Sequence, residues 1–73
     1  MYTPITLNFD KIESLNDFVL NNVQKDCPIT IVKNIDGKIT FSNFIFVPGL
    51  KQEKIFMGDA DKFISEISNQ KKD

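Results

Sequence analysis

The side chains of this 73-residue chain that could do chemistry are few, and the first to consider are the carboxylates of Asp59 and Asp61. General acid–base catalysis relies mostly on His or on carboxylates in a recess, and the chain contains no His. The two carboxylates could be metal ligands, but Mg²⁺ and Ca²⁺ sites gather more oxygen ligands than this pair supplies. A helix N-cap followed by an acid in the first turn explains both residues, because negative charge is favoured there.

Cys27 is the only cysteine. A single cysteine can form neither an internal disulfide nor a zinc site, and a nucleophilic thiol needs a base. We interpret Cys27 as a small thiol that is buried or half-buried. The three glycines, Gly37, Gly49 and Gly58, fall in predicted turns and make no phosphate-binding motif. The sequence therefore predicts no catalytic residue, no cofactor, no metal site and no enzymatic activity.

The charge of the chain is balanced, with nine basic and ten acidic residues and a net charge of −1. Every basic residue is a lysine, and Arg is the residue best suited to bidentate recognition of phosphate and base edges. Nucleic-acid binding is therefore unfavoured and is kept only as a weak alternative. Lys51, Lys54 and Lys38 could form a weak anion patch, but Glu53 and Asp36 interrupt it, which is typical of a solvated face.

Apolar periodicity predicts the elements that would position these residues. Apolar and polar residues alternate over residues 5–9, which indicates a strand. Ser14 is a suitable N-cap for a helix that ends near Asp26, because Pro28 disfavours helical geometry before it. The apolar face of this helix consists of Leu15, Phe18, Val19 and Val23.

Residues 29–41 have the pattern of a β-hairpin. The segment 34–38 suits a three-residue loop closed by a left-handed glycine, with a bulge. This loop pairs Ile31 with Phe41, whereas a two-residue Asp-Gly loop would scatter the apolar side chains over both faces. The apolar side chains then share one face of the hairpin: Ile29, Ile31, Ile39 and Phe41.

The apolar run 44–47 fits either a strand bent by a bulge at residues 42–43 or one helical turn over the sheet. Pro48 and Gly49 end it, and residues 54–57 form a short strand. Asp59 is predicted to cap a final helix with the apolar face Ala60, Phe63, Ile64 and Ile67. The expected fold is α+β: a small antiparallel sheet of three to four strands with two helices on one face, in the order β-α-β-β-(β or short α)-β-α.

The chain has room for one domain, which we place at residues 1–68, followed by a solvated tail at residues 69–73. Hydrophobic residues make up 41% of the sequence and charged residues 26%, as in ordinary folded chains. There is no signal-peptide pattern and no apolar run long enough for a membrane span, so we expect a cytoplasmic protein. The abundance of Lys, Asn, Ile and Phe indicates a low-GC bacterium or a mobile element such as a phage.

The aromatic run suggests a protein-binding surface. In the bent-strand arrangement Phe44 and Phe46 point away from the covered face of the sheet, where exposed aromatic side chains favour protein partners. The predicted surface comprises Phe44, Phe46, Leu50, Lys51 and Lys54. The alternative is that the run is simply part of the core.

Three segments carry a resemblance to a known family. Residues 17–27 lead from a helix into the hairpin, Ser42 to Leu50 follows it, and Gly58-Asp59-Ala60-Asp61 opens the last helix. In their order these segments resemble the HPr phosphocarrier family, in particular the HPr-related members that lack the phosphorylatable histidine. The resemblance covers most of the chain and rests on pattern.

The family's active-site loop, with its His and Arg, is replaced here by residues 9–13, so the resemblance does not imply phosphocarrier activity. It does imply that Ser42 matches the family's regulatory serine and that residues 44–47 match its partner-binding patch. Ser42 is therefore a possible modification site.

The sequence favours a non-catalytic protein-binding or regulatory module, possible also as a homodimer. One alternative is a small inhibitor, encoded by a phage or mobile element, that blocks a host or defence enzyme. Another is a degenerate phosphotransfer protein modified at Ser42. Genomic neighbourhood would distinguish the first alternative, and phosphate incorporation by a serine kinase the second.

Overall fold

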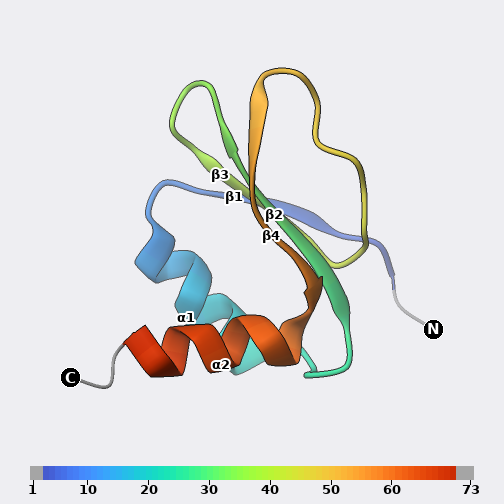
Figure 1. Cartoon of the computed structure of the whole chain (residues 1–73), viewed down its shortest axis with the longest axis vertical. Coiled ribbons are helices and arrows are strands. Elements are labelled where there is room, and N and C mark those ends of the chain that lie inside the picture. The colour runs from blue at the N-terminus through green and yellow to red at the C-terminus, as the bar shows by residue number, and fades with distance from the viewer. Residues whose placement is uncertain (1–2, 71–73) are drawn as a thin grey trace.

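The structure is a computed structural model that describes residues 3–70. Figure 1 shows its elements in the order β-α-β-β-β-α. They are the strands β1 (Thr6–Phe9), β2 (Pro28–Asn34), β3 (Ile39–Ser42) and β4 (Gln52–Asp59), and the helices α1 (Ile12–Asn22) and α2 (Ala60–Gln70). The predicted α+β class is confirmed, with four antiparallel strands in one sheet and two helices.

The strands lie in the order β1-β3-β2-β4, and each neighbouring pair is antiparallel. Strands β3 and β4 flank β2 on its two sides and are both antiparallel to it, so they run parallel to each other. Their connection, residues 43–51, must therefore cross β2, and we call it the crossing segment. Figure 1 shows the crossing segment on one side of the sheet, the crossing side, and both helices on the other, the helix side.

The β2–β3 hairpin has the predicted register. Ile31 lies opposite Phe41. The Asn34 N–H donates to the Lys38 carbonyl over 2.8 Å, and the Gly37 N–H donates back to the Asn34 carbonyl over 2.9 Å. Gly37 has a φ of 91°, a conformation that glycine adopts without a steric penalty. The three-residue loop predicted from the sequence is confirmed.

The core lies between the helices and the helix side of the sheet. Aromatic rings line it, with Phe18 placed edge-on to Phe41 at a centroid separation of 5.4 Å and Phe9 at 5.8 Å from Phe18. The buried core residues are Leu15, Val19, Cys27, Ile29, Ile31, Ile39, Phe41, Ala60, Phe63 and Ile67. The apolar faces predicted for the two helices and the hairpin all contribute to this core, which accounts for their periodicity.

Helix α1 begins earlier than predicted, so the assignment of Ser14 as its N-cap is wrong. Lys11 occupies the N-cap with extended backbone and without a side-chain capping bond. The first turn closes through the main chain, where the Leu15 N–H donates to the Lys11 carbonyl over 3.4 Å. The helix ends at Asn22 rather than near Asp26.

Helix α2 follows β4 directly, and main-chain carbonyls cap it. The Ala60 N–H donates to the Cys27 carbonyl and the Asp61 N–H to the Lys25 carbonyl, each over 2.9 Å. The loop before β2 thus does the capping that the sequence assigns to the Asp59 side chain. The helix continues through the first two residues of the predicted tail to Gln70, and residues 71–73 lie outside the described residues.

The crossing segment forms neither the bent strand nor the helical turn expected for it. A segment that crosses β2 cannot run alongside a neighbouring strand, so it has no ladder of hydrogen bonds to join. Pro48 lacks an N–H and disfavours helical geometry at the preceding residue, which opposes a helix.

Candidate functional site

The middle of the crossing segment is anchored by a single hydroxyl on β2. Thr30 is fully buried and points to the crossing side, because its neighbours Ile29 and Ile31 face the helices. Its Oγ1 donates to the Phe44 carbonyl over 2.9 Å and accepts from the Phe46 N–H over 3.3 Å. These two bonds hold the segment against the sheet where ladder bonds are lacking.

The end of the crossing segment is anchored by a polar ladder, which runs across all four strands from Gly49 to Asn8. The Gly49 N–H donates to Gln52 Oε1 over 2.8 Å, and Gln52 Nε2 donates to Asn34 Oδ1 over 2.9 Å. Asn34 Nδ2 donates to Thr40 Oγ1, and Thr40 Oγ1 donates to Asn8 Oδ1, both over 2.7 Å. The ladder fixes the turn that carries Leu50, because Gln52 bonds to both Gly49 and the sheet.

The apolar side chains of the crossing segment are exposed to very different extents. Phe44 and Phe46 pack on each other at 6.0 Å between ring centroids. Phe44 is 38% exposed and Phe46 is half-buried. Val47 is 88% exposed and Leu50 is fully exposed, at 107%. Val47 and Leu50 are therefore the side chains that protrude into solvent, whereas the two phenylalanines are only partly accessible.

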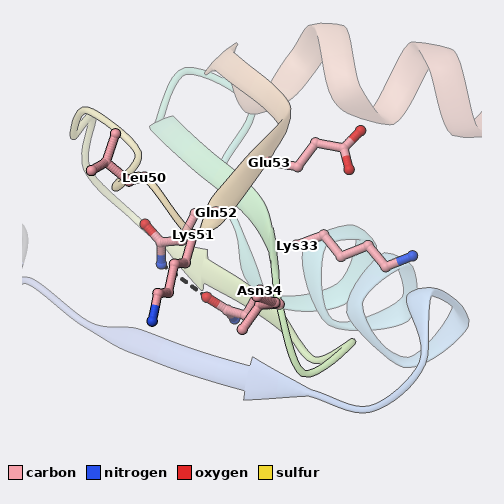
Figure 2. Close-up of a pocket in the computed structure, with 7 residues that line it drawn as sticks. Lys33, Asn34, Leu50, Lys51, Gln52 and Glu53 are labelled. Atoms are coloured by element: carbon pink, nitrogen blue, oxygen red, sulfur yellow. Dashed lines mark hydrogen bonds between the residues drawn. The ribbon is translucent and has the colours of Figure 1, made fainter.

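A shallow recess of about 320 Å³ lies beside Leu50, between the hairpin tip and the start of β4 (Figure 2). Its lining residues are Lys33, Asn34, Ile35, Leu50, Lys51, Gln52 and Glu53. Ile35, at the hairpin tip, is an exposed apolar side chain like Leu50. Figure 2 shows the side chain of Lys51 extending to one side of this region and those of Lys33 and Glu53 to the other.

The charges around the surface are mixed, with lysines close to the apolar side chains. Lys51 lies in the turn with Leu50, and Lys54 lies on β4; both are exposed. Lys38 is paired with Asp10, with 3.2 Å between Nζ and Oδ1, and both side chains are largely solvated. An exposed pair of this kind contributes little to stability. Of the two lysines in the predicted surface, Lys51 lines the recess beside Leu50, and Lys54 of β4 lies opposite Val32 of β2.

Ser42 does not present its hydroxyl to a modifying enzyme. It is only 1% exposed, and its Oγ lies 3.2 Å from Thr6 Oγ1 on the neighbouring strand. A kinase requires its target serine in an accessible, extended segment, whereas Ser42 is the last residue of β3 and paired on both sides. The assignment of Ser42 as a modification site is therefore not supported in the folded protein.

The other candidates for chemistry lie in structural positions. Cys27 is buried, and its Sγ is 3.5 Å from the Pro28 carbonyl oxygen and 3.7 Å from that of Asn43. Asp59 and Asp61 are exposed at the junction of β4 and α2. Within residues 3–70, no three or more His, Cys, Asp or Glu side chains gather in a group that could hold a metal ion.

Comparisons with known proteins give no indication of function, so the proposal below is argued from the surface of the crossing segment. The chain matches no family model, no curated protein and no solved structure. The resemblance to the HPr family therefore stays a prediction. Among residues 3–70, neither helix has both the length and the apolar character that crossing a membrane requires.

Leu50, the most exposed apolar residue of this surface, was predicted from the sequence, whereas Val47 was included only through the family resemblance and Ile35 was missed. A usable signal was present for Val47, because Pro48 and Gly49 follow it and mark a turn, and turn residues are the ones that solvent reaches. No such signal exists for the position of Ile35 beside Leu50, since the sheet order that brings them together depends on long-range pairing.

Proposed function

We propose that the chain is a non-catalytic protein-binding module, and that it docks the crossing segment onto a partner protein. The observation that carries this proposal is the exposure of Val47 and Leu50 on a segment held against the sheet by hydrogen bonds. Burying a Val or Leu side chain is worth about 1.5–3 kcal/mol each, so a partner that covers both would gain affinity from them.

The anchoring of the segment supports a binding role. Ordering a flexible loop on association costs about 0.5–1.5 kcal/mol for each immobilised side chain, and a segment that is already ordered avoids part of this cost. Thr30 and Gln52 fix the segment from both the middle and the end. Phe44 and Phe46 pack on each other and add partly accessible aromatic surface to the same segment, and aromatic residues are enriched in the centres of interfaces.

The charges indicate the chemistry of the partner. Lys51 lines the recess beside Leu50 together with Lys33 and Glu53, so the matching surface is an apolar depression with a carboxylate on its rim opposite Lys51. The partner in this proposal is a different protein, and a second copy of the chain is an outcome that the test below detects. As part of the same proposal we place the module in the cytoplasm, because a chain with one cysteine cannot form the internal disulfides typical of small secreted domains.

The experiment is site-specific photo-crosslinking in the cells that produce the protein. A benzophenone amino acid replaces Leu50 in one variant and the exposed Ser65 on the outer side of α2 in the control. The proposal predicts one dominant adduct from position 50 that is absent from position 65, with a mass that corresponds to a different protein.

Each other outcome contradicts a defined part of the proposal. An adduct with twice the mass of the chain would mean that the crossing segment docks onto a second copy of the chain and not onto a different protein. Adducts that are the same from positions 50 and 65, or none from either, would overturn the crossing segment as a docking surface.

A further inference from the structure

The two edges of the sheet are built differently. Strand β4 forms one edge, and it carries a β-bulge at Ile55 and the charged residues Glu53 and Lys54. Bulges and charged side chains on an edge strand hinder its pairing with a strand of another chain. Strand β1 forms the other edge, and within residues 3–70 it pairs with β3 alone. That pairing is unbroken and β1 contains no charged residue, so its outer edge is open to a further strand.

The main-chain groups on the outer edge of β1 belong to Thr6 and Asn8. Ile5 bonds towards β3, because its N–H donates to Asn43 Oδ1 over 2.9 Å and its carbonyl accepts from the Asn43 N–H over 3.3 Å. Residues of an antiparallel strand bond alternately to its two sides, so Leu7 also bonds to β3. The N–H and C=O groups of Thr6 and Asn8 therefore point away from the sheet.

The side chains of residues 5–9 follow the same pattern in both directions from Leu7. Apolar Ile5, Leu7 and Phe9 alternate with polar Thr6 and Asn8. The apolar side chains lie on the helix side, because Phe9 packs against the core. Ile5 and Leu7 are still 39% and 36% exposed there. A segment with this symmetry can pair with an antiparallel copy of itself without placing an apolar side chain opposite a polar one.

We propose that β1 pairs with β1 of a second copy of the chain, antiparallel, with the two Leu7 residues opposite each other. Thr6 of each copy then lies opposite Asn8 of the other, and each of these pairs exchanges two main-chain hydrogen bonds. A shift by two residues in either direction would leave one such pair within β1, so this register is the one that uses both residues. A two-fold axis between the Leu7 residues relates the copies, as in other isologous dimers, and the two sheets become continuous.

The side chains favour the same register. The Leu7 residues form a pair without main-chain bonds between them, which is the kind that brings side chains closest, and Ile5 lies beside them opposite Phe9 of the second copy. Asn8 ends the polar ladder, which uses it through Oδ1. Its Nδ2 can therefore donate to Thr6 Oγ1 of the second copy. The partly exposed apolar side chains become covered, and the ladder continues into the second sheet.

The proposed interface is separate from the docking surface of the crossing segment and does not rest on its function. Strand β1 lies at the opposite edge of the sheet from β4, whereas Leu50 directly precedes β4. The two-fold axis is perpendicular to the sheet, so both copies have their crossing sides on the same side of the dimer. Together the two proposals describe a dimer with two docking surfaces that face in the same direction.

The test combines sedimentation equilibrium with amide hydrogen exchange of the whole chain. We expect the mass to rise from that of one chain to that of two between about 1 μM and 1 mM, as for a weak homodimer. The amides of Thr6 and Asn8 point outward in the monomer and become bonded in the dimer. Their exchange should therefore slow at least about tenfold at the upper concentration.

Two variants with the same kind of change distinguish the edges. Leu7→Lys places like charges opposite each other and should weaken the dimer at least about tenfold. Ile55→Lys makes a matched change on β4, at 41% exposure against 36%, and should leave the dimer unchanged. A third variant, Thr6→Pro, removes an outward N–H and no main-chain bond to β3, and should also weaken the dimer. The dispersion of the amide spectrum shows in each case that the variant is folded.

A chain that stays monomeric at about 1 mM would overturn the proposal. A dimer that forms without slower exchange at Thr6 and Asn8 would place the interface elsewhere and overturn it as well. Equal weakening of the dimer by Leu7→Lys and Ile55→Lys would have the same meaning.

Discussion

The two sides of the sheet are closed in different ways. On the helix side, α1 and α2 cover the strands with apolar side chains that repeat every three or four residues, and the buried contacts are aromatic and aliphatic. On the crossing side, an irregular segment of nine residues (43–51) lies over the strands and is held by named hydrogen bonds from Thr30 and the polar ladder. Packing covers the helix side, whereas directional bonds hold the crossing segment, whose Val47 and Leu50 are the two most exposed large apolar side chains within residues 3–70.

The largest effect expected is on the helix side. Phe41 is fully buried at the centre of the core, so Phe41→Ala should cost about 3–5 kcal/mol through lost burial and the cavity left behind. A domain of this size has a stability of only a few kcal/mol, so the variant should be largely unfolded by circular dichroism. The control is Phe44→Ala on the crossing side, which should remain folded because Phe44 is already partly solvated. Equal losses in the two variants would remove the distinction between the sides.

A smaller effect is expected from the anchor of the crossing segment. Thr30→Val keeps the shape of the side chain and removes the hydroxyl, so the Phe44 carbonyl and the Phe46 N–H lose their partner. We expect a loss of about 1–3 kcal/mol in urea denaturation and faster hydrogen exchange at the Phe46 amide. Unchanged exchange at Phe46 would show that something other than Thr30 holds the segment.

An opposite and smaller effect is expected at Asn16 on α1. Asn16→Leu removes the unsatisfied acceptor from the helix face and should raise the free energy of unfolding by about 1 kcal/mol in the absence of any ligand. Asn21→Leu is the matched control, because it removes a satisfied amide from the exposed part of the same helix and should change stability by less. Loss of stability in Asn16→Leu would indicate that the Asn16 side chain already has its partner within the fold.

The smallest effect on stability is expected at the protruding residues. The double variant Val47→Asp/Leu50→Asp changes side chains that solvent already surrounds, so the free energy of unfolding should stay within about 0.5 kcal/mol of the wild type. A larger loss would mean that these side chains pack against the domain, and their role as a docking surface would then be contradicted.

The same difference between the sides explains how much the sequence could predict. On the helix side, the signals are local. The turn residues of the hairpin predicted the register of Ile31 with Phe41, and the repeat of apolar residues predicted the buried faces of both helices. Capping was predicted less well, because backbone groups rather than the Ser14 and Asp59 side chains close the helix starts.

On the crossing side, local signals were insufficient. The course of the crossing segment follows from β2 lying between β3 and β4, and strand order is a property of the whole chain. The sequence predicted Phe44, Phe46 and Leu50 as apolar side chains of the surface, but only Leu50 among them is fully exposed. The bulge at Ile55 in β4 was missed because no Gly, Pro or other turn residue in the sequence marks it.

The central claim is that Val47 and Leu50 form the centre of a docking surface. Its most direct test is the affinity of the partner captured at position 50, measured by isothermal titration calorimetry. The Val47→Asp/Leu50→Asp variant is compared with Ser65→Asp/Ser68→Asp, which adds the same charge to the exposed side of α2. The account predicts at least about a tenfold loss of affinity for the first variant and none for the second. Equal affinities of the two variants would contradict it.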